Sequence, residues 1–158
     1  IKNWLNGHMD RKLMFSDDIE YFYNVKAVKI SDSERKIKRI GRFVANFTCE
    51  PYAYITEGQR KIKLGNALIN RWEKTEPIYY IQGAGKAELI VNGYAIEVMV
   101  DKEIIIDTKL GLCFSDTGEI RNTAMYGDYD EIKLRVGKNN FQVSDGFQVY
   151  IKPNWRCI

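Results

Sequence analysis

The chain has 158 residues, of which 45% are hydrophobic and 28% are charged. This composition is typical of a folded globular protein and excludes an intrinsically disordered chain, and the length fits one domain or two small ones. A balance of 24 basic against 21 acidic side chains gives a net charge of +3. That charge is too small to indicate a nucleic-acid-binding protein. The sequence has neither a signal peptide nor an apolar run of roughly 18 residues, so we expect no membrane insertion.

The first 55 residues read as an incomplete domain. The chain starts at Ile1 without a methionine, which indicates a fragment or a processed product, and a short helix around Trp4 and Leu5 is expected to end at Gly7. Two strand-like runs follow, at residues 21–30 and 37–50, and they make at best a hairpin. Because two strands cannot bury a stable core alone, residues 1–55 are expected to be the end of a domain whose beginning is missing.

Strict alternation of apolar and polar residues predicts three antiparallel strands with one buried face. The first run places four side chains on one face, namely Phe43, Ala45, Phe47 and Cys49. The second spans residues 131–136 and points Ile132, Leu134 and Val136 inward. The third points Phe147, Val149 and Ile151 inward.

Turn residues separate further strands. Asn92-Gly93 lies between two alternating runs and predicts a type I′ hairpin, since both central residues of that turn need a positive φ. Asp145-Gly146 predicts another hairpin before Phe147, and Gly83-Ala84-Gly85 a looser one between residues 78–82 and 86–91.

Turn signals every roughly 8–12 residues are typical of an all-β sandwich or jelly roll. We therefore expect everything from Lys61 onward to be β-structure, with a domain boundary near residues 51–54. Residues 56–158 then hold about eight strands, enough for a complete antiparallel sandwich.

No catalytic constellation emerges from the sequence. Asp116-Thr117-Gly118 matches the triplet of aspartic proteases, but the polar neighbours Ser115 and Glu119 are typical of an ordinary turn. His8 is the single histidine and has no nucleophile motif around it. The Gly83-Ala84-Gly85 segment is not a phosphate loop, because no Gly-Lys-Ser/Thr follows. We predict no catalytic residue and no cofactor.

The cysteines and charged runs indicate no further site. Cys49, Cys113 and Cys157 are an odd number of widely spaced thiols, which excludes a zinc module and a disulfide framework and favours buried thiols in a reducing compartment. The basic run at residues 35–39 reads as a solvated strand or turn rather than a phosphate site. Asn46-Phe47-Thr48 forms a glycosylation sequon, interpreted as accidental without a secretory signal.

Aromatic residues leave two interpretations open. Five of them could form stacking platforms for sugar rings or could serve in the core and at subunit interfaces. They are Trp72, Tyr79, Tyr126, Tyr129 and Trp155.

The order of several short motifs resembles the distal tail proteins of long-tailed phages, a family also described as siphovirus tail components. The matching pieces cover nearly the whole chain and keep the family's order. They are Trp4-Leu5 with residues 13–18, residues 41–52, Glu76-Pro77-Ile78, Gly83-Ala84-Gly85, Val91-Asn92-Gly93, residues 104–107, Gly137-Lys138-Asn139 and residues 151–158. The segment from 107 to 130 departs from the family pattern, because Tyr126-Gly127-Asp128-Tyr129 stands where an apolar and proline-containing approach is usual.

The resemblance implies a structural virion component, not an enzyme. Such proteins form six-fold rings at the tail tip and join the tail tube to the baseplate, tip or receptor-binding proteins. Residues 1–55 would be the end of the ring-forming first domain and residues 56–158 an outward-facing, galectin-like β-sandwich. The protein would be made in a bacterial cytoplasm and would be located in the virion tail.

Two further expectations accompany this resemblance. The hairpin of residues 21–30 and 37–50 is expected to be covered by a neighbouring subunit, because its own strand partners are missing. The rival function is a module that binds saccharides of the host cell wall, with Trp72 and the loop of Tyr126 and Tyr129 as stacking residues.

Overall fold

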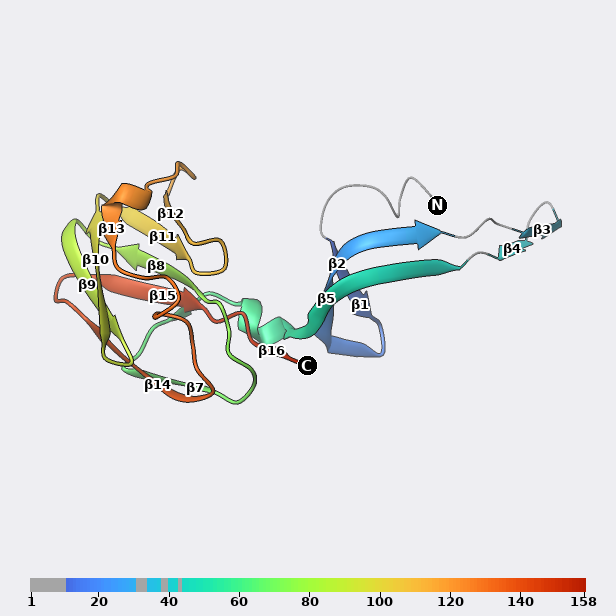
Figure 1. Ribbon diagram of the computed structural model, residues 1–158, viewed down its shortest axis with the longest axis horizontal. Helices are drawn as coiled ribbons and strands as arrows, with labels where there is room; N and C mark the ends of the chain where they lie inside the picture. Colours follow the sequence, from blue (N-terminus) through green and yellow to red (C-terminus); the bar gives the residue numbers. More distant parts are fainter. Residues whose placement is uncertain (1–10, 31–33, 38–39, 43) are drawn as a thin grey trace. The chain divides into compact units, whose positions relative to one another are not determined.

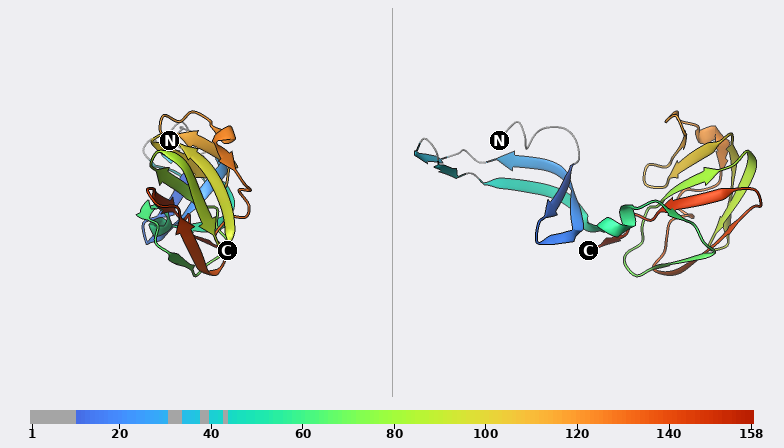
Figure 2. Two further views of the ribbon diagram at one scale, coloured as in Figure 1. Left: turned by 90° about the vertical axis from the view of Figure 1, so that its left-hand side faces the viewer. Right: turned by 180° about the vertical axis from the view of Figure 1, so that it is seen from behind.

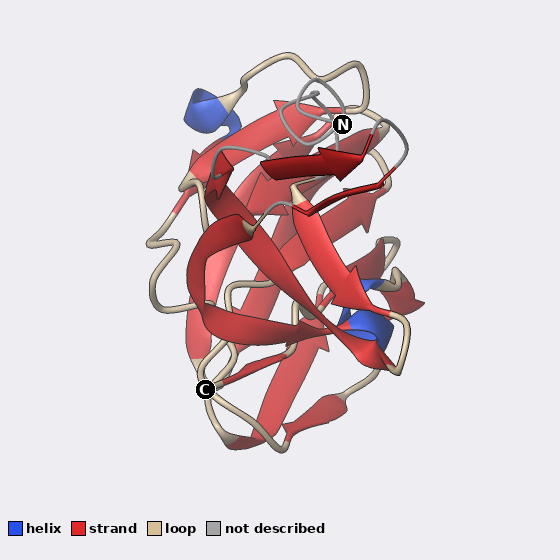
Figure 3. Cartoon of the chain, turned by 90° about the vertical axis from the view of Figure 1, so that its right-hand side faces the viewer, coloured by secondary structure: helices blue, strands red, loops and turns tan. Residues whose placement is uncertain are grey.

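The computed structural model of the chain describes residues 11–30, 34–37, 40–42 and 44–158. The described residues fall into two units, one reaching to Tyr54 and the other spanning Ile55–Cys157 (Figure 1). Both are built from strands, and the helices of the described part are two single 3-10 turns (Figure 3). The helix expected around Trp4 lies outside the described residues.

The first unit is built on two long strands. β2 (Asp18–Ile30) lies between β1 (Lys12–Phe15) and β5 (Ala45–Ile55), while β3 (Glu34–Ile37) and β4 (Ile40–Arg42) form a separate antiparallel pair. The strand expected at residues 21–30 is confirmed within β2. The run expected at residues 37–50 is instead divided among the end of β3, β4 and β5, and β5 continues through Pro51 to Ile55.

Few apolar side chains of the first unit are buried. Among its described residues these are Phe22, Val25 and Tyr54, with the rings of Phe22 and Tyr54 stacked at 5.4 Å. Phe47, expected to point inward, is 38% exposed, and Phe15 is 52% exposed. Phe43, expected on the same face as Phe47, lies outside the described residues. This unit therefore leaves much of its apolar surface in water.

The second unit consists of two five-stranded antiparallel sheets (Figures 1 and 2). One sheet has the order β13-β10-β9-β14-β7 and the other the order β12-β11-β8-β15-β6. In chain order the elements of this unit are η1 (Thr56–Gln59), β6 (Ile62–Lys63), β7 (Ala67–Asn70), β8 (Ile78–Gln82), β9 (Gly85–Val91), β10 (Tyr94–Val100), β11 (Glu103–Asp107), β12 (Leu112–Ser115), η2 (Asn122–Ala124), β13 (Met125–Tyr126), β14 (Gly137–Val143), β15 (Gln148–Lys152) and β16 (Arg156–Cys157).

Alternating side chains of the two sheets form the core. β8 buries Tyr79 and Ile81 and β11 buries Ile104 and Ile106, while the residues between them are only half-buried. β9, β10 and β15 repeat the same period of two. The prediction of an all-β antiparallel sandwich is confirmed.

The Asn92-Gly93 hairpin is confirmed in detail. Asn92 has a φ of 52° and Gly93 a φ of 88°, as a type I′ turn requires, and β9 pairs with β10 from Val91 opposite Tyr94. The side chain of Asn92 also connects this turn to β14, because its Oδ1 accepts a hydrogen bond from the backbone N–H of Asn140 at 3.0 Å.

The other two expected hairpins are wrong. β8 ends before Gly83, yet it pairs with β11 and β15, whereas β9 pairs with β10 and β14. Asp145-Gly146 likewise connects β14 in one sheet to β15 in the other. Both turns carry the chain from sheet to sheet, and the ring of Phe147 packs beside Gly83, where a Cβ would lie 2.4 Å from its Cδ1.

The strand expected at residues 131–136 is also wrong. Ile132 and Leu134 are fully buried as predicted, but Val136 is 63% exposed. Only Leu134 makes a strand-like bridge, to Thr75, and the remaining residues form turns, bends and irregular backbone. Asn139 accounts for this, since its buried amide hydrogen-bonds the backbone of Arg135 and of Gly137 in place of a neighbouring strand.

Candidate functional site

Polar and aromatic side chains gather on the outer face of the sheet that contains β8, β11 and β15. They alternate with the core residues of these strands, so the period of two directs them away from the core. We call this set, together with Lys61 from just before β6, the polar-aromatic face; its residues on the three strands are Tyr80, Gln82, Glu103, Gln148 and Tyr150.

Strand register places these side chains in two rows. Gln82 lies opposite Glu103 on one side and Gln148 on the other, and Tyr80 lies opposite Ile105 and Tyr150. Directly opposed side chains in antiparallel strands are close enough to interact. A row of amides and a carboxylate therefore runs beside a row in which the two phenol rings lie between Ile105 and Lys63.

Lys61 lies across both rows from the neighbouring edge. Its Nζ is 4.0 Å from the ring centre of Tyr80 and 5.3 Å from that of Tyr150. The same Nζ donates to Glu103 Oε1 at 3.0 Å, and Gln82 Nε2 donates to that oxygen at 2.8 Å. Five side chains of the face are thus joined in one contact network.

These contacts change the acidity of two groups. Burial raises the pKa of the Glu103 carboxyl, but the hydrogen bonds from Gln82 and Lys61 outweigh it and hold that pKa below its ordinary value. Burial, with the negative charges of Glu103 and Asp107, raises the pKa of Tyr80. At neutral pH the face therefore presents the Glu103 carboxylate beside the protonated phenol of Tyr80.

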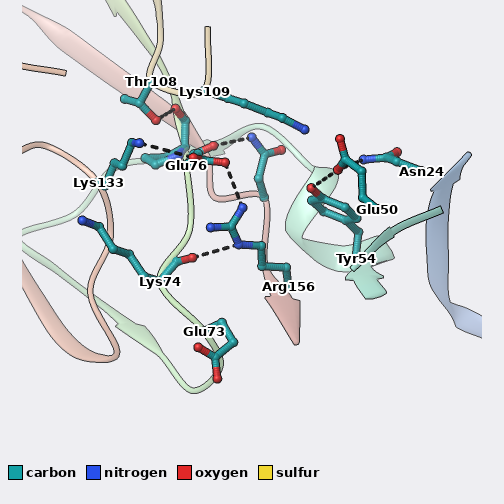
Figure 4. Close-up of polar contacts among 12 residues, drawn as sticks. Asn24, Glu50, Tyr54, Glu73, Lys74, Glu76, Thr108, Lys109, Lys133 and Arg156 are labelled. Carbon is teal, nitrogen blue, oxygen red and sulfur yellow. Dashed lines mark hydrogen bonds and ion pairs between the residues drawn. The ribbon is translucent and has the colours of Figure 1, made fainter. Parts of the chain in front are cut away.

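A second cluster, centred on Glu76, is structural in character (Figure 4). Arg156 Nη1 contacts Glu76 Oε2 at 2.8 Å and Lys133 Nζ contacts Oε1 at 3.2 Å, while Arg156 Nε donates to the carbonyl of Lys74 at 2.9 Å. Asn154 Nδ2 donates to the carbonyl of Glu76 at 2.7 Å. The cluster fastens the end of the sandwich to the segment before β8.

Figure 4 also shows a small network within the first unit. Glu50 Oε2 accepts from the Tyr54 hydroxyl at 2.6 Å and from Asn24 Nδ2 at 3.2 Å. Because Asn24 belongs to β2 and Glu50 to β5, the network joins the two long strands.

Three of the expected stacking residues belong to the packing of the second unit. Tyr79 is fully buried and donates its hydroxyl to the carbonyl of Ile132 at 2.7 Å. Trp155 is 7% exposed, and its ring lies 5.6 Å from that of the half-buried Trp72. Tyr79 and Trp155 are therefore not stacking platforms, and Trp72 packs against Trp155 with the two ring planes tilted by 43°.

Tyr126 and Tyr129 do not join Trp72 in one site. Tyr126 is 81% exposed on the edge strand β13, and Trp72 follows β7 on the opposite edge of the same sheet. Four strand spacings separate these edges, or about 19 Å. The hydroxyl of Tyr129 is buried and has no partner within the described part of the chain.

The Asp116-Thr117-Gly118 triplet forms a surface turn. Gly118 has a φ of 84° and its N–H donates to the carbonyl of Ser115 at 3.0 Å. Asp116 is exposed and pairs with Lys102 at 3.4 Å, so its carboxylate faces solvent rather than a second buried carboxylate.

The remaining candidates from the sequence provide no site. In the residues that the structure describes, no group of three His, Cys, Asp or Glu side chains is placed to hold a metal, and no helix is long and apolar enough to cross a membrane. Cys113 is a buried free thiol, whereas Cys49 and Cys157 are half-buried, so only one thiol is as buried as expected. His8 and the side chains of residues 35–39 lie outside what is described.

Sequence inspection missed Tyr80 and Tyr150 because each is one residue away from a core position. The alternation that buries Tyr79 and Ile151 directs Tyr80 and Tyr150 outward. The signal was present in the pattern, but the pairing of β8 with β15 could not be read from it.

Comparison of structures gives the fold of a known protein. The chain matches the crystal structure of SPP1 Dit (gp 19.1), described as a paradigm of the hub adsorption apparatus in Gram-positive infecting phages, with a TM-score of 0.61 and 14% sequence identity. The match covers 96% of this chain and 67% of that one. By sequence alone, no protein-family model and no curated protein matches the chain. The likeness establishes a shared fold across both units.

Proposed function

We propose that this chain is a structural component of a phage or prophage tail, a distal tail hub protein. It links the tail tube to the baseplate or tip and supports host attachment. The observation that carries the proposal is that the match to SPP1 Dit covers 96% of the chain, including both units rather than the sandwich alone. A β-sandwich by itself occurs in many unrelated proteins. The match is therefore more informative because it also includes the first unit.

In this proposal residues 1–55 belong to a ring-forming domain and residues 56–158 to a galectin-like domain. The partners are further copies of the chain in a homohexameric ring, the tail tube protein and the tail-tip, baseplate or receptor-binding proteins. The protein is made in the cytoplasm of the bacterial host and ends in the virion tail. It works as an assembly part and not as an enzyme.

The surface of the first unit supports assembly. Phe15 and Phe47 are 52% and 38% exposed, while only Phe22, Val25 and Tyr54 are buried among the described apolar side chains of that unit. Exposed apolar surface of this kind is typical of protein contacts. In a ring of identical copies, each subunit is related to the next by a fixed rotation. The same pair of complementary surfaces therefore meets at every interface.

Light scattering and negative-stain microscopy of the purified chain test this proposal. We expect particles of six copies with six-fold rings, and we expect Phe47→Asp to reduce them to monomers without loss of β-sheet circular dichroism. Met99→Asp is the matched control, because Met99 is at least as exposed as Phe47, at 53% against 38%, but lies on the sandwich. A chain that stays monomeric at all concentrations, or rings that survive Phe47→Asp, would contradict the assembly role of the first unit.

A further inference from the structure

We propose that the polar-aromatic face binds a neutral saccharide built of pyranose rings. The ligand stacks on the rings of Tyr80 and Tyr150 and receives hydrogen bonds from the neighbouring row of Gln82, Glu103 and Gln148. This inference stands on the geometry of the sandwich and does not depend on the role proposed for the tail.

The two phenol rings provide the apolar part of the site. Tyr80 and Tyr150 are direct partners on adjacent strands, and both are half-buried with their outer parts in solvent. A pyranose ring has an apolar face of C–H groups and a polar rim of hydroxyls. Side chains with an aromatic body and a polar end match such a ligand, because they provide both kinds of contact.

The adjoining row provides hydrogen-bonding groups. Gln82 Nε2 donates to Glu103 Oε1 at 2.8 Å, so both planar groups are held in place before a ligand arrives. An amide has two N–H donors and a carbonyl acceptor, and a carboxylate has two acceptor oxygens. Gln82 therefore keeps a donor and its acceptor, and Glu103 keeps Oε2, for the hydroxyls of a sugar.

The charges favour an uncharged ligand. Lys61 and Glu103 neutralise each other at 3.0 Å, Asp107 and Lys152 lie on either side of Ile78, and Lys63 lies opposite Tyr150. A phosphate chain would require a larger excess of positive charge than the three lysines and two carboxylates of these rows provide.

A protein partner fits this face less well than a saccharide. The centres of protein interfaces are depleted of charged residues and rich in apolar side chains. Here the Lys61–Glu103 pair lies at the centre. The large apolar side chains of this unit that are most exposed lie elsewhere, among them Ile69, Met99, Leu110, Ile120 and Val136.

Lys61 covers the site when it is empty. Its ammonium lies 4.0 Å above the ring of Tyr80, where a sugar ring would stack. The Lys61 side chain is 39% exposed, and both ion pairs and cation–ring contacts are weak at exposed positions, so a ligand can displace it. Removing this side chain should therefore strengthen binding.

Titration of the whole chain, followed by ¹H–¹⁵N NMR, tests the site with two neutral probes, chitohexaose and maltohexaose. We expect at least one probe to shift amides of β8, β11 and β15, with a dissociation constant below about 10 mM. Tyr80→Ala and Tyr150→Ala should each weaken binding about tenfold, and Lys61→Ala should strengthen it about threefold.

Tyr126→Ala is the matched control, because Tyr126 is an 81% exposed tyrosine on the other sheet, and its loss should leave the affinity unchanged. If a tyrosine variant loses its dispersed spectrum, Gln82→Ala and Gln148→Ala replace it and should each weaken binding about fivefold. The proposal is overturned if neither probe shifts these strands at about 10 mM. It is equally overturned if the shifts lie on other elements, or if the folded variants bind as tightly as the natural chain.

Discussion

Gly58 shows how one missing side chain lets the end of the sandwich close. It is buried in η1, and its carbonyl accepts from the N–H of Asn154 at 2.8 Å. A Cβ at this position would lie 2.5 Å from the backbone nitrogen of Trp155 and 2.9 Å from its Cδ1. Contact with backbone cannot be relieved by a change of rotamer, so the position requires glycine.

Gly58→Ala should therefore lower the free energy of unfolding by about 1–3 kcal/mol, as overpacking of a filled core does. Urea denaturation followed by tryptophan fluorescence would measure the change. Gly65→Ala is the control, since no atom lies within 4 Å of its Cβ position, and we expect a change of at most about 0.5 kcal/mol. Equal effects of the two substitutions would refute the role of the contact with Trp155.

The buried phenol of Tyr79 should make the stability of the fold depend on pH in the alkaline range. Burial raises the pKa of its phenol far above the ordinary value, so the folded state keeps a proton that the unfolded chain releases above about pH 10. A group with a raised pKa in the folded state stabilises it below the unfolded pKa, and the stability is lost as the pH rises.

We therefore expect the urea midpoint of the natural chain to fall between about pH 9.5 and 11, and to fall less steeply in Tyr79→Phe. At pH 7 the variant should be about 1 kcal/mol less stable, because the carbonyl of Ile132 loses its partner. If the urea midpoints of the two proteins fell equally with pH, the expectation would be contradicted, because Tyr79 would then ionise as easily in the folded state as in the unfolded chain.

At the level of elements, Asn139 organises the region between the Ile132 turn and β14. Its Oδ1 accepts from the Arg135 N–H at 2.9 Å and from Asn92 Nδ2 at 2.8 Å. Its Nδ2 donates to the carbonyls of Arg135 and Gly137 at 2.8 and 3.1 Å. One buried amide thus connects the β9–β10 turn, β14 and the segment that precedes β14.

Asn139→Ala should destabilise the protein by about 2–4 kcal/mol, because it leaves several buried polar groups without partners. Asn140→Ala serves as the comparison, since its side chain is exposed and its backbone N–H still bonds Asn92 Oδ1. We expect Asn140→Ala to stay within about 0.5 kcal/mol of the natural chain in thermal denaturation. A similar melting temperature for the two variants would contradict the assignment.

The turns show which features of the fold can be predicted from neighbouring residues in the sequence. Asn92-Gly93 was predictable because the type I′ turn depends on two adjacent residues whose φ values are positive. Gly83 and Gly146 also have positive φ, yet they connect the two sheets rather than hairpin partners. Turn residues mark where a strand ends, whereas the choice of the next neighbour depends on packing of distant segments.

Burial was more predictable than secondary structure in residues 131–136. Ile132 and Leu134 are in the core as their alternation indicates, but the backbone around them is held by Asn139 and a bridge to Thr75. For the candidate site, the pattern identified core positions such as Tyr79. It did not reveal that Tyr80 and Tyr150 become neighbours, because the register of β8 and β15 joins residues about 70 positions apart.

For the whole molecule, the two units differ in how well they bury their apolar residues. The sandwich has a continuous core between two sheets, while the described part of the first unit exposes Phe15 and Phe47. That contrast fits a subunit that folds around one domain and assembles through the other. The fold shared with SPP1 Dit extends over both units, since the match covers 96% of the chain.

Immunogold electron microscopy of the phage particles released by the source cells tests the central claim most directly. An antibody against the sandwich unit should place gold at one end of the tail, and particles lacking the gene for this chain should show no label. Gold spread along the tail or over the head, or label found only on cell debris, would contradict the role of the chain as a distal tail hub protein.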